Sequence, residues 1–475
     1  MNNYASIESK KDELPEAPLL RMFVLGLILV LPSFLYGLDL SYPTIAVSQM
    51  QLDLDEASWI GSVAVFVSPI SSIIVGIVID SFGRKTAILY SILPSIVGWS
   101  LQYYSSSMPF IIWGQIFNGL SLGSISYPVQ VYAGECIMMG SIRLRNSFMV
   151  WIAVGTSLAT TLMLLLSTFL TYHDICGICT AFSILLFALF AVIIPESPTW
   201  LYHEGRIGDA EWSQSKLGIA QPILDKNSRL NHPIEPLEDF QWSTVTKNLN
   251  KITRRDVYIP LIVMSTFAIL YGFSGGASAV TYMVNIIDDS IPGTQQSIDM
   301  NAMKNQTSTV HFSESTKYSL ICGIAMCIGS LLTSFVLPCL GLRASFVFSH
   351  IGSVVGLLAL TFSNVIIQST ETALTIRISA VTLLSFLVSI TLGPTMAASG
   401  DIFPVDAKGF ASIPDVVGNL ASGVSIKMFP YLYYILAGYT YLVFAAISVI
   451  SAVYAYFLLP EVVGKTLKQI NEEFG

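Results

Sequence analysis

Apolar runs long enough to cross a lipid bilayer recur along the chain, with short polar segments between them. A helix needs roughly 20 apolar residues to span the hydrocarbon. The pattern predicts twelve transmembrane helices, at about residues 20–46, 57–80, 86–106, 109–134, 147–170, 174–195, 257–286, 318–340, 344–366, 373–400, 409–436 and 438–459. The predicted fold class is an all-α polytopic membrane protein.

The predicted spans fall into two sets of six. The parts, in order, are a tail of residues 1–19, a six-helix half of residues 20–195, a polar stretch of residues 196–256, a second six-helix half of residues 257–459 with a polar loop at residues 287–317, and a tail of residues 460–475. Two such halves around a central site are typical of carriers that rock about their substrate.

Composition agrees with this pattern and excludes several classes of protein. Hydrophobic residues make up 53% of the 475 and charged residues only 11%, with a mean hydropathy of +0.66. A soluble domain carries about a quarter charged residues, so a single soluble core is excluded. The net charge of −8 comes largely from tails and loops and indicates no nucleic-acid partner. The polar start indicates no cleavable secretory signal.

Lysine and arginine gather in alternate loops, which predicts the orientation. The basic loops include those with Arg84, Lys85, Arg143 and Lys408, and the whole stretch 196–256. We therefore expect both tails and that stretch to be cytoplasmic, and loop 287–317 to be extracellular. The single glycosylation sequon begins at Asn305 in that loop, so we expect Asn305 to carry a glycan.

Four loop motifs add information about the family. They read "DSFGRKTAIL" (80–89), "YAGE" (132–135), "PESPTWLYHEGRIGDAE" (195–211) and "PEVVGKTLKQINEEF" (460–474). Together, over the whole chain, they resemble the sugar porters of the major facilitator superfamily. The stretch "SWIGSVAVFVSPISSIIVGIVIDSFGRK" (58–85) looks most like the insect facilitated trehalose transporters of that family. The resemblance implies the major facilitator fold and sugar transport by alternating access at the plasma membrane.

The resemblance also implies a cytoplasmic gate of charge pairs that break when the halves tilt. Its members are Asp80, Gly83, Arg84, Lys85, Glu135, Arg143, Glu196, Asp401, Lys408 and Glu461. The corresponding turn of the second half reads "LPCLGLRASF" (337–346), where Pro338 replaces the acid, so that half of the gate is expected to be weaker. The alternative is that these charges are ordinary solvated loop residues that follow the positive-inside rule.

A sugar site needs polar side chains for the hydroxyl groups and aromatic rings for the apolar faces of the ring. The candidates are Asp39, Asn118, Gln130, Ser274, Tyr282, Asn285 and Asn419. The resemblance supports Ser274, Tyr282 and Asn419, but Tyr271 and Gly272 stand where the family has paired glutamines. The pocket is therefore expected to be less polar than a standard hexose site. A mid-span amide can equally bridge two helices as packing.

Asp39, within the first span, is a functional-site hypothesis because a charge inside the bilayer is costly. It stands where proton-coupled sugar porters carry an aspartate. The arginine that assists this acid in those porters is replaced here by Gln115, which cannot stabilise the charged form as a cation would. We therefore favour uniport over proton symport through Asp39.

The sequence disfavours two further classes of function. A sugar receptor with little flux is disfavoured because both predicted cytoplasmic tails are short. An enzyme is not expected, because no constellation of nucleophile and base and no phosphate-binding loop occurs. Cys176 and Cys179 form a lone CxxC pair in an apolar run, so neither a metal site nor a cofactor is expected. The expected partners are a small sugar, the bilayer and, in the symport alternative, a proton.

Overall fold

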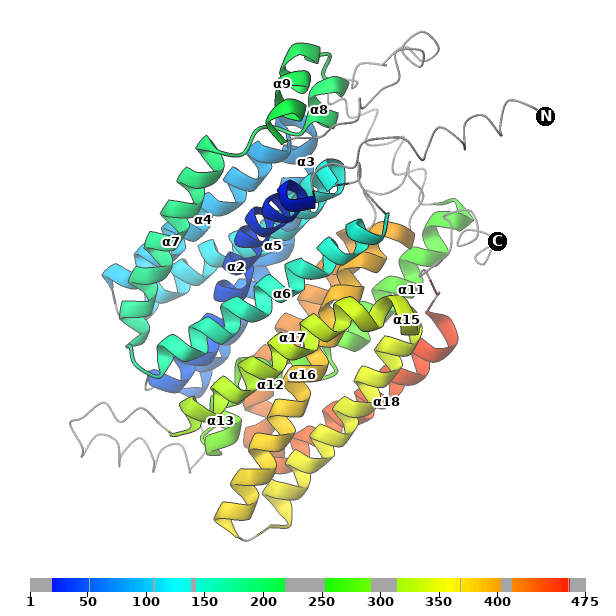
Figure 1. The fold of residues 1–475 in the computed structure, drawn as a ribbon. Coiled ribbons are helices and arrows are strands. Elements are labelled where there is room, and N and C mark those ends of the chain that lie inside the picture. Colours follow the sequence, from blue (N-terminus) through cyan, green and yellow to red (C-terminus); the bar gives the residue numbers. More distant parts are fainter. Residues whose placement is uncertain are drawn as a thin grey trace.

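A computed structural model gives the fold of the protein and describes residues 19–50, 52–105, 107–137, 142–217, 253–291, 314–367, 369–402, 412–459 and 461. Within these ranges every regular element is a helix. The long helices lie side by side in two groups, one from each half of the chain (Figure 1). The predicted all-α class is therefore confirmed.

The first helix group comes from the N-terminal half, and each of its helices coincides with one predicted span to within a few residues at either end. It consists of α2 (Leu19–Gln49), α3 (Leu54–Phe82), α4 (Arg84–Tyr104), α5 (Met108–Ile137), α6 (Ile142–Ser167) and α7 (Tyr172–Val192). Two of these helices begin with a reciprocal cap. Asp53 exchanges hydrogen bonds with Glu56 at α3, and Thr171 exchanges them with Asp174 at α7. Such boxes satisfy main-chain donors that a helix start leaves unpaired.

Two short helices, α8 (Pro198–His203) and α9 (Ile207–Leu217), lie at the start of the stretch predicted as a polar loop. The Ser197 side chain caps α8, whose first residue is a proline. Proline suits this position because its fixed φ matches the helix and the N–H it lacks would be unpaired. Trp200 and Ala210 belong to a small apolar cluster between the two helices. This part of the stretch therefore has a core of its own.

The second helix group comes from the C-terminal half. It consists of α11 (Arg255–Gly272), α12 (Gly276–Thr281), α13 (Met283–Asp288), α15 (Glu314–Val365), α16 (Thr370–Ile402), α17 (Ser412–Leu436), the 3₁₀-helix η5 (Ala437–Tyr439) and α18 (Thr440–Leu458). The predicted span 257–286 is divided into α11, α12 and α13, since Gly275 interrupts it with a φ of 85°. The spans 318–340 and 344–366 run together as α15, with a break at Gly341, whose φ is 79°. Glycine adopts such angles without steric cost.

Eight stretches of the described helices are long and apolar enough to cross a membrane. The last of them, Ile413–Leu458, covers two predicted spans. The predicted spans 86–106 and 109–134 are not among the eight, and both carry amide side chains such as Gln102 and Gln115, which are fully buried. The structure thus shows a polytopic membrane protein, while the number twelve remains a prediction.

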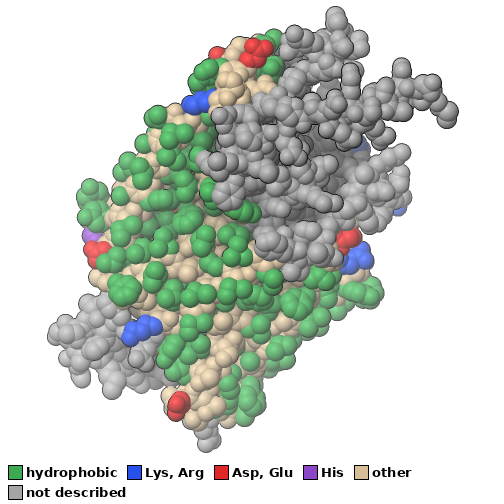
Figure 2. Space-filling model, viewed as in Figure 1, with side chains coloured by type: hydrophobic (Ala, Val, Ile, Leu, Met, Phe, Trp, Pro, Cys, Tyr) green, Lys and Arg blue, Asp and Glu red, His purple; other side chains and the backbone are tan. Residues whose placement is uncertain are grey.

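The outside of the helix bundle is apolar over the face that Figure 2 shows. Large exposed side chains include Ile73, Leu185 and Ile450, as suits contact with lipid tails. Inside the first group, small residues let helices approach closely. A Cβ atom at Gly119 would lie 2.5 Å from the carbonyl oxygen of Ala64, so α3 and α5 meet backbone to backbone at this point.

Candidate functional site

Two turns of the same construction occur, one in each helix group. In the first group, Gly83 joins α3 to α4 with a φ of 97°. The Glu196 carboxylate accepts the main-chain N–H groups of Arg84 at 2.8 Å and Lys85 at 2.9 Å. A Cβ atom at residue 83 would overlap that carboxylate. The negative charge therefore lies at the N-terminus of α4, where the helix dipole favours an anion.

Burial changes the proton affinity of both charged groups at this turn. It raises the pKa of Glu196 above its ordinary value, while main-chain N–H groups, led by that of Lys85, act in the opposite direction. Burial lowers the pKa of the Lys85 ammonium against the attraction of Glu196. The Nζ atom of Lys85 donates to the carbonyl oxygen of Ala191 at 2.7 Å. Lys85, expected in a charge pair, thus makes its hydrogen bond to the main chain.

Arg84 and Glu135 form a charge pair of the kind that the resemblance implied. The NH2 atom of Arg84 lies 2.8 Å from Oε1 of Glu135, and its Nε donates to the same oxygen at 2.9 Å. The other carboxylate oxygen of Glu135 accepts the hydroxyl of Ser197. Such charge-assisted bonds are stronger than neutral ones. They hold α4, α5 and the segment before α8 together.

The second turn lies inside α15, at Gly341. The Glu461 carboxylate accepts the main-chain N–H groups of Leu342 at 2.8 Å and Arg343 at 3.1 Å. A Cβ atom at Gly341 would lie 2.6 Å from a Glu461 oxygen, and the Nε atom of Arg343 donates to the carbonyl of Leu459 at 2.9 Å. The loss of the acid at Pro338 therefore leaves the turn of the second group with its carboxylate cap intact.

The structure adds main-chain bonds to the expected role of the two glutamates. Glu196 and Glu461 were expected to act in charge pairs, which stays a prediction, and each also accepts main-chain N–H groups at the start of a helical segment. The bonds given above also join elements of one group only. Of the remaining gate candidates, Asp80, Arg143 and Asp401 lie on α3, α6 and α16 with side chains outside the description, and Lys408 and the sequon residue Asn305 lie outside the described residues altogether.

The broken helices α12 and α13 bring the second group against the first. Tyr282, which is fully buried, donates to the carbonyl of Ala57 on α3 at 3.3 Å. The hydroxyl of Thr44 on α2 donates to the carbonyl of Val280 at 3.1 Å. Tyr282, a sequence candidate for substrate binding, thus bridges the two groups through its hydroxyl.

The other polar candidates of this region are placed as follows. The Ser274 hydroxyl, in the turn after α11, donates to the carbonyl of Tyr271 near the end of that helix at 2.7 Å. Asn285 is buried and donates to the carbonyl of Ser290 at 3.2 Å. Asn419 is half-buried on α17, and Gln130 is half-buried on α5. Ser274 and Asn285 therefore donate to main-chain carbonyl groups close to them in sequence, whereas Asn419 lies on a helix at the boundary between the groups.

Asp39 is fully buried in the first group. Ser121 on α5 and the indole of Trp99 on α4 are donor side chains that lie near its carboxyl. Asn118 lies beside them, against Gly98 of α4. Among the described residues, the polar side-chain atoms of Asp39, Trp99, Asn118 and Gln115 lack a partner at hydrogen-bonding distance. Asp39 thus faces α4 and α5, and Asn118 of α5 faces α4, inside one group.

A set of contacts that the sequence did not reveal joins α3 to α17 near the start of α3. The Nζ atom of Lys427 donates to the hydroxyl of Ser58 at 2.7 Å and lies 3.8 Å from the centre of the Trp59 ring. The hydroxyl of Tyr431 donates to the carboxylate of Asp55. We call these five residues the α3–α17 clasp. Each of its bonds runs from one helix group to the other.

A family model described as "Sugar (and other) transporter" matches residues 23–474. The chain belongs to this family of sugar transporters. Curated relatives include the facilitated trehalose transporter Tret1 of Apis mellifera ligustica, which is 23% identical over 95% of this chain and 87% of its own length. The sugar transporter ERD6-like 7 of Arabidopsis thaliana is 24% identical over 96% of this chain and 94% of its own length.

Solved structures of the xylose transporter XylE from E. coli are similar to this sugar porter. The partially occluded inward-open form matches with a TM-score of 0.70 and 15% identity, over 94% of this chain and 99% of that one. Another XylE structure in the comparison is described as a proton:xylose symporter of the major facilitator superfamily. At such identity the likeness shows the fold, which is that of the major facilitators, as the sequence motifs implied.

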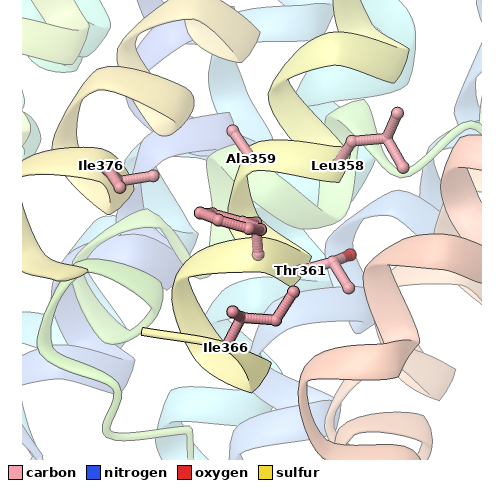
Figure 3. Close-up of a pocket in the computed structure, with 6 residues that line it drawn as sticks. Leu358, Ala359, Thr361, Ile366 and Ile376 are labelled. Carbon is pink, nitrogen blue, oxygen red and sulfur yellow. The ribbon is translucent and has the colours of Figure 1, made fainter. Parts of the chain in front are cut away.

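One hollow on the surface of the sugar porter does not suit a sugar. It has a volume of about 540 Å³ and lies between α15 and α16, where Figure 3 shows the side chains that line it. Leu358, Phe362, Ile366 and Ile376 make it apolar, with the hydroxyl of Thr361 already bonded to its own helix. Sugar hydroxyl groups would find no partner there, so this hollow is not the substrate site.

Metal chemistry finds no support in the described residues, since no three His, Cys, Asp or Glu side chains there are grouped as metal ligands. Of the five cysteines whose side chains are described, four, including Cys176 and Cys179, are buried. Sequence reasoning missed Lys427 and Asp415 on α17, although each is a charged residue inside an apolar run. That signal is the same one that singled out Asp39.

Proposed function

We propose that this sugar porter carries trehalose or a glucose-like sugar across the plasma membrane by alternating access, as a uniporter driven by the sugar gradient. The α3–α17 clasp supports alternating access. Its bonds run between the groups and consist of weak contacts, a cation–π pair and single hydrogen bonds. Contacts of that kind break and re-form when two rigid bodies rock, whereas the glutamate-capped turns keep each group intact.

The environment of Asp39 supports uniport. Its neighbours Trp99 and Ser121 are uncharged, and the acid is buried within the first group. A proton carrier needs a partner whose charge changes the affinity of the acid for its proton during the cycle. Proton symport through Asp39 is the second candidate, favoured by the burial of this carboxyl inside the bilayer.

The topology belongs to the same proposal. We place both tails and the stretch 196–256 in the cytoplasm, because lysine and arginine gather there. Loop 287–317, with a glycan on Asn305, then lies outside. In this orientation the α3–α17 clasp closes the extracellular end of the central space. A mobility shift on glycosidase treatment that disappears in Asn305→Gln would support the placement of this loop.

The decisive experiment is uptake in cells that lack their own sugar transporters. Labelled trehalose and labelled glucose are supplied with and without a proton ionophore. Saturable uptake that does not exceed the outside concentration and survives the ionophore supports uniport. Collapse of concentrative uptake with the ionophore favours symport, and absence of uptake of either sugar at normal surface expression refutes the proposal.

A further inference from the structure

Contacts on one side of α17 show which way that helix is turned. Gly418 packs against α11, because a Cβ atom there would lie 3.1 Å from Cβ of Ala268. Two turns further on, the hydroxyls of Ser425 and Ser278 lie 3.1 Å apart, which joins α17 to α12. This side of α17 therefore faces its own helix group.

Contacts on another side of α17 point to the first group. Gly423 packs against the ring of Phe66 on α3, and Lys427 bonds Ser58 on the same helix. With about 3.6 residues per turn, these two sides are nearly opposite and leave two flanks. One carries the exposed Met428 and Ile435 and faces outward, and the other carries Asp415. Asn419 lies one turn further along the same face. Asp415 therefore faces the space between the two helix groups.

Two tyrosines approach Asp415 from other helices. Tyr36 on α2 lies within electrostatic range of the Asp415 carboxyl and of the Tyr271 phenol. Its neighbour in sequence, Gly37, packs against Thr156 of α6. Asp39 points in another direction, to α4 and α5, so Tyr36 emerges between α5 and α6 on the side of the second group. Tyr36 and Asp415 thus face each other across the central space.

Tyr271 completes this set of residues and is held in place by its own group. Its hydroxyl accepts a hydrogen bond from Thr391 of α16 at 3.2 Å. Its ring stacks with that of His350, 6.1 Å between centroids, and with that of Phe267. His350 is the titratable side chain that packs on this ring. The phenol is therefore a fixed surface and not a mobile side chain.

The Asp415 carboxyl has no partner in the described part of the chain. The surrounding helices desolvate it, and neither a hydrogen bond nor an ion pair offsets that burial. It is nevertheless only half-buried, as are Tyr36 and Tyr271, so part of its surface is open to the space between the groups. A charged side chain inside a membrane protein is costly unless it meets a partner. Its two oxygen atoms are then free for donors from a ligand.

We propose that Asp415 is a substrate-binding residue, whose carboxylate accepts hydrogen bonds from two neighbouring hydroxyl groups of the sugar. Carboxylate oxygens are acceptors only, with about four lone-pair positions, which matches a pair of hydroxyl donors. The proposal rests on the proposed sugar transport. It explains how a site that has Tyr271 and Gly272 in place of the family's glutamines still binds a polyhydroxylated ligand, with the ring faces against Tyr36 and Tyr271.

The test compares wild type with Asp415→Ala and Asp415→Asn in the uptake assay, at matched surface expression. Glu371→Gln is the control, because it removes a carboxylate from the exposed first turn of α16. Loss of a hydrogen bond to a charged acceptor predicts a KM for glucose about 10- to 100-fold higher in Asp415→Ala. Asp415→Asn, which keeps one acceptor oxygen, should fall between, and Glu371→Gln should match wild type.

Deoxy sugars make the test specific to hydroxyl recognition. Wild type should discriminate against the monodeoxyglucose that lacks a bound hydroxyl, and Asp415→Ala should lose that discrimination, as a double-mutant cycle requires for a direct contact. An unchanged KM, or discrimination that persists in Asp415→Ala, overturns the proposal. So does a variant that loses concentrative uptake but keeps counterflow, since Asp415 would then carry a proton. Failure of wild type to transport any sugar would instead refute the proposed function.

Discussion

The α3–α17 clasp should set the balance between the conformation described here and one in which the two groups have separated at the clasp. In Lys427→Met the apolar stem is kept but the charge is lost. The contact of Lys427 with Trp59, a ring 48% exposed, contributes about 0.5–1 kcal/mol. The hydrogen bond to Ser58 contributes about 1 kcal/mol. Because both bonds join the two groups, their loss should shift the equilibrium by about 10- to 30-fold.

Distances between spin labels measure this shift. Tyr104 on α4 and Tyr434 on α17 belong to different groups and are 82% and 64% exposed, so cysteines there would accept labels readily. In a background free of native cysteines, Lys427→Met should enlarge the population with the longer distance. Lys216→Met is the matched control, because Lys216 lies over Trp212 within α9 and joins no groups. The same distribution in Lys427→Met and wild type would refute the reasoning, as would an equal shift in the control.

Three further predictions concern other parts of the structure. Asp39→Asn should keep most of the sugar uptake, because the acid has no cation beside it to make a proton switch; abolished uptake at normal surface expression would contradict this. Gly83→Ala should lower the thermal stability in detergent by about 1–3 kcal/mol through backbone strain and overlap with the cap. Gly205→Ala, with a φ of 73° and open space around it, isolates the strain alone, so an equal loss in both variants would argue against the overlap. The raised pKa of Glu196 should make the protein more stable below the ordinary glutamate pKa, an increment lost as pH rises through the raised value. The difference in melting temperature between wild type and Glu196→Gln across pH 4 to 8 measures that increment, and a difference that does not change with pH would exclude it.

Hydrophobic pattern was enough to predict the helices, because the bilayer requires long apolar runs whatever their packing. The pattern did not predict where the backbone leaves the helical conformation inside an apolar run. The span at 257–286 is apolar throughout, yet Gly275 breaks the helix. At Gly341 the backbone of α15 departs sharply from helical angles between two helical segments. Glycine in these turns was visible in the sequence, but only the contacts of Glu196 and Glu461 show why each turn needs it.

The candidate site was harder to predict, for a geometric reason. Motifs singled out Arg84 and Glu135, which do form an ion pair. Asp415 and Lys427 belong to no motif, and what they contact depends on how α17 is rotated about its axis. A rotation of α17 by the angle between two consecutive residues would turn Asp415 toward a neighbouring helix. The period of the apolar pattern in the sequence does not determine this rotation angle to that accuracy, whereas the contacts of Gly418 and Gly423 do.

The two glutamate-capped turns have a mechanical consequence. Glu196 follows α7, the last helix of the first group, and reaches back to the turn between α3 and α4. Glu461 follows α18, the last helix of the second group, and reaches back to the Gly341 turn inside α15. Each group is thus held together by a carboxylate that follows its last helix. Force that separates the groups would break the α3–α17 clasp and leave both carboxylate caps in place. If the chain were divided between residues 217 and 253, each of the two fragments would keep its own capped turn.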